Sequence, residues 1–354
     1  MHVTIDTNPL YVTRAGVARY IRGLLSGFNE LSSEALTVSQ LAWAVDSFSY
    51  TQPLRGMKTL YRERIWPGTT AARWLRTEQP DILHIMSGLP FCRATRTRAV
   101  ATLYDLAVIK HPERFRRWHR HAAQDRFKRL HDMDRIICIS QFTADEAMAL
   151  LGLPASRLEV VHLASSFGDK SAKQGEVSLP DSIPAEFFLF VGSLEPGKNL
   201  TLLKQAYARA ASEGHHLPPL VIVGERWKGV PNEGTPRSDW IYAGILSDAQ
   251  LAQLYRKALA LVFPSQYEGF GLPLLEAMSM GCPVICSRVA SLPEVAGDAA
   301  CYADATAEAY RESMAYLAAN ADVREGLAAR GAERAQRFSW TRCAAETRAV
   351  YEMV

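Results

Sequence analysis

Two carboxylates and one lysine are the side chains that could act together on an anionic ligand. Glu268 and Glu276 lie eight positions apart, and Lys198 follows a glycine-containing loop earlier in the chain. A carboxylate accepts hydrogen bonds from neighbouring sugar hydroxyls, and an ammonium group pairs with phosphate oxygens. The combination predicts a site for a sugar that is linked to a diphosphate.

The segment between the two carboxylates predicts a strand end, a loop and a helix start. The apolar run that ends near Phe263 reads as a strand, and the two glycines that follow let a backbone approach a ligand closely. Pro273 fits the start of a helix, where its missing N–H costs nothing. We expect free N–H groups around Phe270 to Leu274, which with the helix dipole would bind a diphosphate. Glu276 is expected in the first turn of this helix.

The loop before Lys198 nearly matches the phosphate-binding pattern GxxxxGK[ST]. It starts at Gly192-Ser193 and ends at Lys198-Asn199. Asn199 stands where a hydroxyl residue would hold magnesium, and no apolar strand ends in the aspartate that would complete a metal site. The pattern therefore argues against a nucleoside-triphosphate hydrolase or kinase. Lys198, after a strand end and beside glycines, is still well placed to bind a diphosphate.

Short apolar runs, each followed by a helical pattern, predict the elements that position these residues. The predicted strands are Val3 to Ile5, Ile82 to Ile85, Ala99 to Leu103, Ile136 to Ile139, Phe187 to Val191, Leu220 to Val223, Leu259 to Phe263 and Val284 to Cys286. Strands that alternate with helices predict a parallel sheet covered on both faces. The series occurs twice, which predicts two doubly wound α/β domains that face each other across a cleft.

The predicted domain boundaries follow composition. We assign residues 1–165 to an N-terminal domain, and the polar residues 166–184 to a linker. Residues 185–337 form a second domain, and residues 338–354 a last helix.

Composition sets limits on function. The chain has 354 residues, of which 48% are hydrophobic and 22% charged, with a net charge of +3. These values are typical of a folded protein and do not favour a polyanion binder. The start of the chain lacks a signal-peptide pattern and no apolar run is long enough to span a membrane, so a cytoplasmic location is expected. The six cysteines are scattered without zinc-site spacing, which predicts reduced thiols and no metal.

Glu268 and Glu276, with Gly-Phe-Gly-Leu-Pro between them, resemble the EX7E motif of retaining glycosyltransferases of family 4, which have the two-domain GT-B fold. The resemblance covers nearly the whole chain, and is greatest to bacterial mannosyl- and rhamnosyltransferases that build surface polysaccharides from GDP-sugars. The other matching segments are Gly16 to Tyr20, Tyr104-Asp105-Leu106, His111-Pro112-Glu113, Ser140 to Thr143, Gly192 to Asn199 and Leu292 to Gly297.

The resemblance implies that residues 1–165 bind the acceptor, that residues 185–337 bind the nucleotide-sugar, and that the helix of residues 338–354 returns to the N-terminal domain. It also implies a role for each residue of the motifs. Glu276 should bind the ribose hydroxyls, Glu268 the donor sugar and Lys198 the diphosphate. The backbone of Gly269 to Leu272 should hold the sugar and the distal phosphate, and Gly16 should let the other domain close over that phosphate. No cofactor and no metal are implied, because cations and helix dipoles neutralise the leaving diphosphate. The predicted donor-binding set is Gly16, Gly192, Ser193, Asn199, Gly269, Phe270, Gly271, Leu272, Pro273 and Glu276; the predicted acceptor and donor-sugar side is Tyr104, Asp105 and Arg19.

The sequence departs from the family pattern in two places. Tyr104 stands where relatives usually have a histidine that touches the donor sugar or the acceptor. Ser193 and Gly197 stand where many relatives have a diphosphate-binding arginine. Arg19, Arg14 and Lys228 are the cations that could replace it, and the sequence does not rank them.

Two basic stretches in the N-terminal half predict a charged surface. Residues 110–135 contain nine Lys or Arg against four acidic residues, and residues 55–76 contain further basic residues interleaved with aromatic and aliphatic ones. Such faces suit the inner-membrane surface or a lipid-linked acceptor, although an ordinary charged helix face is an equal alternative. Nucleic acid is not expected as a partner.

Together these features predict a retaining hexosyltransferase that moves mannose or rhamnose from a nucleoside-diphosphate sugar, GDP-linked rather than UDP-linked, to a glycan or lipid-linked acceptor. Glu268 and Lys198 are the predicted catalytic residues. A sugar-nucleotide epimerase with two similar domains and a non-catalytic nucleotide-sugar-binding protein are the alternatives. The acceptor, the linkage and the oligomeric state are left open by the sequence.

Overall fold

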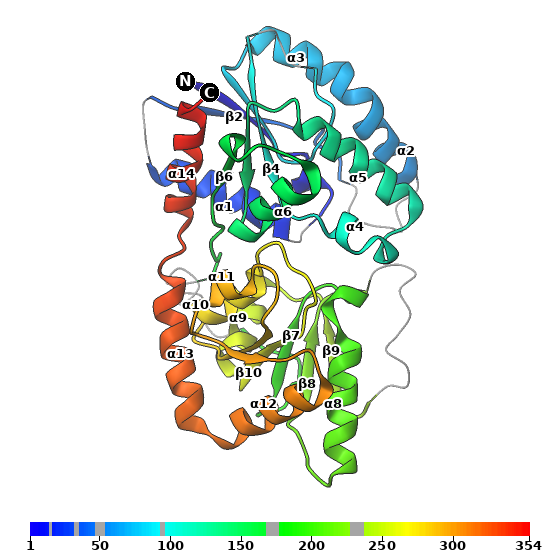
Figure 1. Cartoon of the computed structure of the whole chain (residues 1–354), viewed down its shortest axis with the longest axis vertical. Coiled ribbons are helices and arrows are strands. Elements are labelled where there is room, and N and C mark those ends of the chain that lie inside the picture. The colour runs from blue at the N-terminus through cyan, green and yellow to red at the C-terminus, as the bar shows by residue number, and fades with distance from the viewer. Residues whose placement is uncertain (14–15, 32–34, 47–53, 93–95, 168–176, 227–236) are drawn as a thin grey trace. The chain divides into compact units, whose positions relative to one another are not determined.

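The computed structural model describes residues 1–354 except 14–15, 32–34, 47–53, 93–95, 168–176 and 227–236. The chain divides into two compact units, one of residues 1–164 with 339–354 and one of residues 165–338. Part of the predicted linker, residues 168–176, lies outside the described residues. Figure 1 labels most of the elements of each unit.

The first unit is built on a parallel sheet, which in the described residues has six strands in the order β2-β1-β3-β4-β5-β6. The four central strands are buried along nearly their whole length, as expected for strands covered on both faces. The strands are β1 (His2–Asp6), β2 (Thr37–Leu41), β3 (Ile82–Ile85), β4 (Arg98–Leu103), β5 (Arg135–Cys138) and β6 (Leu158–Val160).

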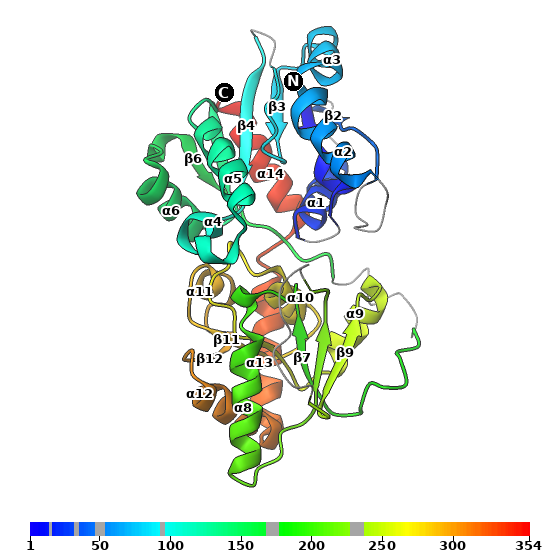
Figure 2. The ribbon, with the colours of Figure 1, turned by 90° about the vertical axis from the view of Figure 1, so that its right-hand side faces the viewer.

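Helices cover both faces of this sheet. The described helices are α1 (Gly16–Leu31), α2 (Arg55–Leu60), α3 (Thr70–Glu78), α4 (Ala107–Lys110), α5 (Arg117–Leu130), α6 (Gln141–Leu151) and α14 (Trp340–Glu352), with the π-helical turn η2 (Tyr61–Ile65) after α2. Residues of α3, α5 and α6 pack with the strands in one apolar cluster. The C-terminal helix α14 lies along α1, far from it in sequence (Figure 2).

Two glycines of α1 make this close approach possible. A Cβ atom on Gly23 would lie 2.1 Å from the Trp340 ring, and one on Gly27 would lie 2.2 Å from the Trp340 carbonyl oxygen. Any larger residue at these positions would force α14 away. The last helix therefore belongs structurally to the first unit.

The second unit repeats the plan, with six described strands in the order β12-β11-β10-β7-β8-β9, all parallel. Its central strands are continuous runs of buried apolar residues. The strands are β7 (Phe188–Val191), β8 (Leu220–Val223), β9 (Trp240–Gly244), β10 (Ala260–Phe263), β11 (Val284–Ser287) and β12 (Cys301–Ala303).

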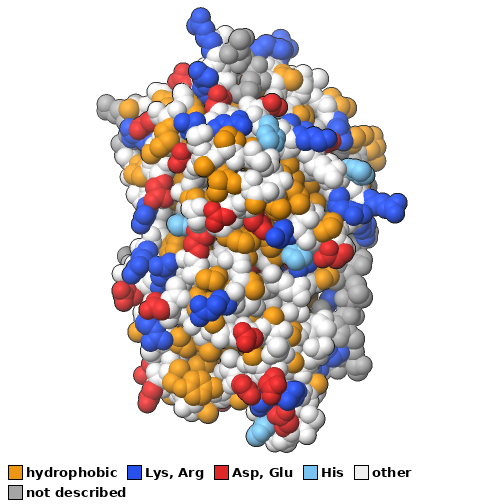
Figure 3. Space-filling model, viewed as in Figure 1, with side chains coloured by type: hydrophobic (Ala, Val, Ile, Leu, Met, Phe, Trp, Pro, Cys, Tyr) orange, Lys and Arg blue, Asp and Glu red, His pale blue; other side chains and the backbone are white. Residues whose placement is uncertain are grey.

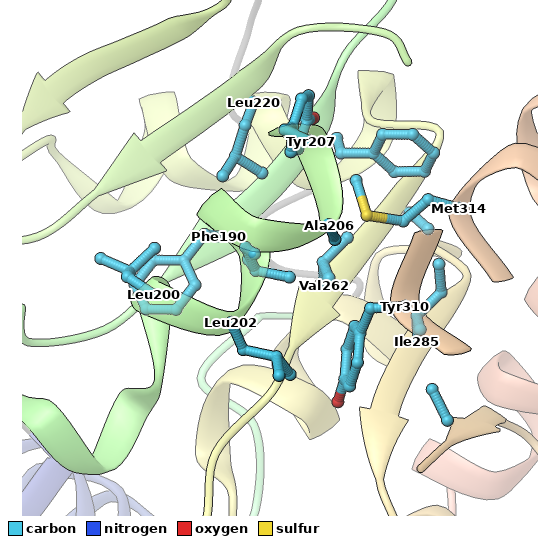
Figure 4. Packing of buried hydrophobic residues seen from close by; sticks show 14 of the residues in the cluster. Phe190, Leu200, Leu202, Ala206, Tyr207, Leu220, Val262, Ile285, Tyr310 and Met314 are labelled. Carbon is cyan, nitrogen blue, oxygen red and sulfur yellow. The ribbon is translucent and has the colours of Figure 1, made fainter. Parts of the chain in front are cut away.

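Helices cover both faces of the second sheet, so alternate residues of each central strand are buried on one face or the other. They are α8 (Leu200–Ser212), α9 (Asp248–Lys257), α10 (Leu272–Ser279), α11 (Leu292–Ala296), α12 (Ala307–Ala319) and α13 (Ala321–Ala335). Figure 4 shows one face, where Tyr207 of α8 and Met314 of α12 meet Phe190 and Val262 from the strands. On the other side α10 packs against α9, α11 and α13.

All eight predicted strands are confirmed, and four further strands were missed. The missed strands, β2, β6, β9 and β12, are the edge strands of the two sheets. Their side chains are only partly buried, so they lack the continuous apolar run that marks a central strand.

Each sheet reverses its strand order at one point. In the first unit the chain runs from β1 to the edge strand β2 and then continues with β3 on the opposite side of β1. In the second unit it runs from β7 through β8 to the edge strand β9 and then continues with β10 on the opposite side of β7. In open parallel sheets, loops diverge at such a point and leave a crevice at the carboxyl ends of the strands. The two reversal points are therefore where ligand sites are expected, β1/β3 in the first unit and β7/β10 in the second.

Candidate functional site

The loops that follow β7 and β10 meet at the reversal point of the second sheet. Lys198 Nζ forms an ion pair with Glu268 Oε1, although the residues are 70 positions apart. The Gln266 N–H donates to the Gly197 carbonyl at 2.9 Å and joins the two loops through their backbones. The structure thus brings together the two residues that the sequence predicts to be catalytic.

Lys198 is held from several sides. It ends a short 3-10 turn (Pro196–Lys198) whose start is capped by Glu195, which accepts from the Gly197 N–H at 2.7 Å. Its Nζ lies 5.3 Å from the centre of the Phe263 ring. The Lys198 and Glu268 side chains are only 17% and 12% exposed, so both are largely buried. A largely buried ammonium beside an apolar ring interacts strongly with any added anion, because little water screens it.

The start of α10 lies directly after Glu268 in the chain. Gly271 precedes it with a φ of +97°, a left-handed conformation that glycine adopts without strain. A Cβ there would also lie 2.7 Å from Leu292. The Leu274 and Leu275 N–H groups both donate to the Gly271 carbonyl, so Leu274 is not among the free amides that the sequence predicts.

Glu276 lies deeper in the unit than predicted. It is the fifth residue of α10, in the second turn of the helix, and no acidic residue lies in the first turn. The prediction of a first-turn glutamate is wrong because the helix begins at Leu272, one residue before Pro273. Glu276 is 2% exposed, and its Oε2 accepts a hydrogen bond from the Tyr255 hydroxyl at 3.1 Å. The Glu276 carboxylate is thus oriented by Tyr255 of α9.

The remaining predicted residues of the second unit surround Lys198. A Cβ on Gly192 would lie 3.7 Å from Lys198 Cε, and Ser193 is half-buried in the same loop. Asn199 has a φ of +57° between the 3-10 turn and α8, a conformation that asparagine tolerates better than most residues. The Gly269 and Phe270 positions lie between the ion pair and α10, and the Phe270 ring packs edge-on against Phe338 at 6.0 Å.

The reversal point of the first sheet carries a pocket of about 410 Å³. Residues after β1, β3 and β4 line it, among them Asn8, Ser87 and Tyr104. The buried Asp6 joins these loops, because it accepts from the Asn8 side chain at 2.7 Å and from the Ser87 N–H at 2.8 Å. Burial raises the pKa of Asp6, while its hydrogen bonds from Ser87 and Asn8 act in the opposite direction.

Tyr104 and Asp105 line this pocket, while Gly16 and Arg19 lie on α1. The Tyr104 hydroxyl donates to Met86 Sδ at 3.7 Å, and its ring packs edge-on against Tyr20. Burial, with Tyr20 and Asp6 nearby, raises the pKa of Tyr104 well above its usual value, so this residue does not act as a base at neutral pH. Asp105 accepts a hydrogen bond from the N–H of Ala107, the first residue of α4, at 2.9 Å.

Sequence reasoning missed Asp6 and Ser87 as organisers of this pocket. Asp6 ends β1, so the expectation that no apolar strand ends in an aspartate is wrong; the predicted run stopped one residue earlier, at Ile5. Ser87 follows the second apolar run, so both residues lie at strand ends. Of the cations considered for the diphosphate, Arg19 is half-buried with interactions of its own, whereas Arg14 and Lys228 lie outside the described residues. Within the described part of the chain, no group of three or more His, Cys, Asp or Glu side chains is placed to hold a metal ion.

Comparison with known proteins identifies the family. Residues 183–334 match the model of glycosyl transferases group 1, and residues 15–164 match that of glycosyltransferase family 4. The chain is 35% identical over 276 residues to O-antigen chain mannosyltransferase B of Escherichia coli, covering 73% of this chain and 71% of that protein. It is 36% identical over 183 residues to the serotype-specific mannosyltransferase WbdA of Escherichia coli, of which it covers 22%.

Solved structures show the same architecture. Sucrose-phosphate synthase from Thermosynechococcus elongatus superposes with a TM-score of 0.74 at 17% identity, covering 99% of this chain and 98% of that one. WaaG, a glycosyltransferase involved in lipopolysaccharide biosynthesis, superposes with a TM-score of 0.66 at 15% identity, with 99% and 98% covered. The fold is therefore the GT-B fold, and the chain belongs to the family 4 glycosyltransferases.

Proposed function

We propose that this protein is a retaining mannosyltransferase that takes mannose from GDP-mannose and adds it to a saccharide acceptor during assembly of a surface polysaccharide. The observation that carries the proposal is the pairing of Lys198 with Glu268 at the reversal point of the second sheet. The similarity to O-antigen mannosyltransferases supports mannose as the sugar. Family membership argues against the epimerase alternative.

The proposed division of labour follows from chemistry. Lys198 offers its remaining ammonium protons to the diphosphate and stabilises the charge that develops as the sugar leaves. Glu268, fixed by Lys198, orients the sugar hydroxyls, and Glu276, fixed by Tyr255, accepts the ribose hydroxyls. The acceptor hydroxyl attacks from the face that the diphosphate leaves, and the departing phosphate oxygen takes its proton. No cofactor or metal is part of this proposal.

A covalent intermediate on Glu268 is the alternative mechanism. The two differ in a measurable way. A Glu268→Ala variant with azide and GDP-mannose yields a mannosyl azide only if the carboxylate acts as a nucleophile that azide replaces, and the proposed mechanism predicts none.

Incubation of the protein with GDP-mannose, UDP-glucose and GDP-rhamnose in separate reactions tests the proposal. Mass spectrometry should detect slow release of mannose and GDP from GDP-mannose, and the Lys198→Met variant should lose it. Isomerised GDP-sugar would indicate an epimerase, and binding of GDP without any turnover would indicate a sensor. NMR of the mannosylated product of a saccharide acceptor should show the α-anomer, which is the donor configuration.

The first unit supports a further part of the proposal, attachment to an anionic membrane surface. Leu54, Met57 and Leu60 on and before α2 are 66%, 66% and 59% exposed, and Trp118 on α5 is 59% exposed. Lys and Arg side chains gather beside hydrophobic ones in the region of these helices (Figure 3). Such amphipathic surfaces bind anionic lipids by burying apolar side chains and pairing charges. No described helix has both the length and the apolar character needed to cross a bilayer.

Vesicle flotation tests this attachment. The protein should float with vesicles that contain anionic lipid, less so at high salt, and the Met57→Glu/Leu60→Glu variant should remain in solution. A Tyr316→Glu variant, which alters an exposed residue of the second unit, is the control. Equal flotation of all three proteins would contradict the proposed surface.

A further inference from the structure

A serine in the loop between β11 and α11 holds the main chain of Glu268. The Ser291 hydroxyl donates to the Glu268 carbonyl oxygen at 2.9 Å, and Ser291 is fully buried. Ser291 directly precedes α11, where a serine usually accepts a hydrogen bond from the first turn of its helix, but among the described residues its side chain forms no such bond. The hydroxyl therefore serves the loop that carries Glu268 and not the helix that follows it.

The backbone that places this serine is strained. Ala290 has a φ of +52°, a left-handed conformation that an alanine adopts only at a cost. Conformations of this kind persist where surrounding contacts fix them, and they are frequent at functional sites. The turn at Ala290 brings Ser291 and Leu292, both fully buried, against the loop that runs from Glu268 to Gly271.

Leu292 supports the other end of that loop. A Cβ atom on Gly271 would lie 2.7 Å from Cδ2 of Leu292, so the leucine packs directly against the Gly271 backbone. Gly271 is the residue that precedes α10. Ser291 and Leu292 thus hold the two ends of the segment that joins Glu268 to α10.

The short helix α11 is itself anchored by an arginine of α13. Arg334 Nε donates to the Val295 carbonyl at 3.0 Å, and Arg334 Nη2 donates to the Glu294 carbonyl at 2.6 Å. The last carbonyls of a helix have no partner inside the helix, and in a helix of five residues they are a large share of the total. Arg334 satisfies two of them and so fixes α11, and with it the position of Ser291 and Leu292.

The side chain and the main chain of Glu268 are therefore held by different residues. Lys198 pairs with the carboxylate, and Ser291 binds the carbonyl. Gly269 follows Glu268, and a glycine puts little restraint on the peptide plane between the two residues. In the proposed function a bound diphosphate draws on the same Lys198 ammonium. The Ser291 hydrogen bond is then the contact to Glu268 that the donor leaves unchanged.

We propose that Ser291 is a positioning residue for sugar transfer, which fixes the peptide between Glu268 and Gly269 so that the Glu268 carboxylate meets the sugar in the reactive geometry. The inference rests on the proposed function for the role of Glu268. Ser291 is fully buried, so it acts through Glu268 and not by touching a substrate. A displacement of about 1 Å at a positioned group lowers a rate by up to about 10². Nucleotide binding depends on other residues, Lys198 and Glu276, and should not change.

Steady-state kinetics of GDP-mannose turnover by Ser291→Ala test the proposal. The variant should lower kcat by about 10- to 100-fold, while its affinity for GDP, measured by calorimetry, should equal that of the wild type because GDP carries no mannose. Ser287→Ala is the matched control, since Ser287 is 2% exposed and its hydroxyl lies 2.9 Å from that of Tyr310. It should lower the melting temperature similarly but keep the wild-type kcat. A wild-type kcat in Ser291→Ala, or an equal loss in both variants, would overturn the proposal.

A double variant decides whether Ser291 acts through Glu268. In a Glu268→Gln background, Ser291→Ala should lower kcat no further, whereas the full additional loss would show that Ser291 acts elsewhere and overturn the proposal. GDP binding shows that each variant folds. If Ser291→Ala does not fold, Ser291→Cys takes its place, because a thiol fills nearly the same space and donates only weakly.

Hydrogen exchange of the backbone amides separates this inference from the proposed function. Exchange in residues 268–272 should be faster in Ser291→Ala than in the wild type and unchanged in Ser287→Ala, because only Ser291 holds that loop. Unchanged exchange in Ser291→Ala would overturn the assignment of the hydrogen bond. The measurement needs no turnover. A wild-type protein that does not turn over GDP-mannose but shows this exchange pattern would contradict the proposed function and leave the positioning of Glu268 by Ser291 intact.

Discussion

Lys198 and Glu268 form an ion pair between the loops that follow two adjacent strands, β7 and β10. The pairing has two consequences. It fixes the ammonium group at the reversal point of the second sheet, and it leaves that group only part of its hydrogen-bonding capacity for a diphosphate. A bound diphosphate would share the Lys198 cation with the Glu268 carboxylate.

Removal of Lys198 should therefore affect transfer much more than stability. We expect Lys198→Ala to lower kcat/KM for GDP-mannose by about 10²–10³, because one preorganised donor to a developing charge typically contributes this much. Steady-state assays of mannose release measure it. Lys257→Ala, which removes an exposed lysine of the same unit, should leave kcat/KM unchanged.

A double-mutant cycle with Glu268→Gln tells a catalytic pair from a structural one. If both residues act on the donor, each single variant loses activity and the melting temperature changes little. Equal losses of stability and activity in the single variants, with no further loss in the double variant, would show that the pair only holds the loops together.

Glu276 should discriminate donors by their ribose hydroxyls. Its carboxylate is oriented by Tyr255, and a hydrogen bond to a charged acceptor contributes about 1.5–3 kcal/mol. Wild-type protein should bind GDP about 10–100 times more tightly than 2′,3′-dideoxy-GDP, and Glu276→Gln should reduce that ratio to nearly 1. Calorimetric titration of both nucleotides measures the ratio, and Glu325→Gln, which alters an exposed residue of α13, is the control. An unchanged ratio in Glu276→Gln would mean that the carboxylate is structural.

The position of α14 should depend on Gly27. A methyl group there would meet the Trp340 carbonyl oxygen at 2.2 Å and its carbonyl carbon at 2.7 Å, and backbone atoms cannot rotate away as a side chain can. Gly27→Ala should lower the free energy of unfolding by about 1–3 kcal/mol and expose α14 to proteolysis. Urea unfolding and limited trypsin digestion measure the two effects. Gly68→Ala, where nothing lies within 4 Å of the new Cβ, should behave as the wild type does, and a stable, protease-resistant Gly27→Ala would refute the close packing.

The sequence predicted the central strands and not the edges for a physical reason. A central strand of a doubly wound sheet is buried on both faces and so reads as a run such as Phe188–Val191, whereas in β9 half-buried residues alternate with exposed ones after the buried Trp240. A five-residue alternating segment cannot be told from a loop by composition alone. The fold was still predictable, because the central strands fix the repeated pattern and the edges only extend it.

The site was predictable to the extent that it follows strand ends. Lys198 and Glu268 come after β7 and β10, and adjacency of those strands brings them together. Glu276 was placed one turn too early because the exact helix start depends on Gly271, whose left-handed conformation is a property of the loop. The full lining of the pocket in the first unit could not be predicted, since residues of η2 and α5 come together around it only in the folded unit.

His84 should make the stability of the first unit depend on pH. Its side chain is fully buried in β3, with Nδ1 2.7 Å from the Tyr351 hydroxyl of α14 and Nε2 2.8 Å from the Thr102 hydroxyl of β4. Burial lowers the pKa of His84 to about 3 from a usual value of 6.5. Above pH 6.5 the ring is neutral in both the folded and the unfolded chain, so its contribution to stability is fully present there. As the pH falls from 6.5 towards 3, only the unfolded chain takes up the proton, and stability falls by about 1.4 kcal/mol per pH unit.

The slope of stability against pH isolates this proton from the others. Urea unfolding of wild type and His84→Gln between pH 7 and pH 4 should give two lines, and the wild-type free energy of unfolding should fall more steeply below pH 6.5 by about 1.4 kcal/mol per unit. Carboxylates titrate alike in both proteins and cancel in the difference, so a lower overall stability of the variant does not disturb the comparison. His215→Gln, which replaces an exposed histidine of the second unit, should retain the wild-type slope. Equal slopes for wild type and His84→Gln would mean that the ring takes up its proton while still folded, and the link from β3 to the C-terminal helix would then not depend on a neutral imidazole.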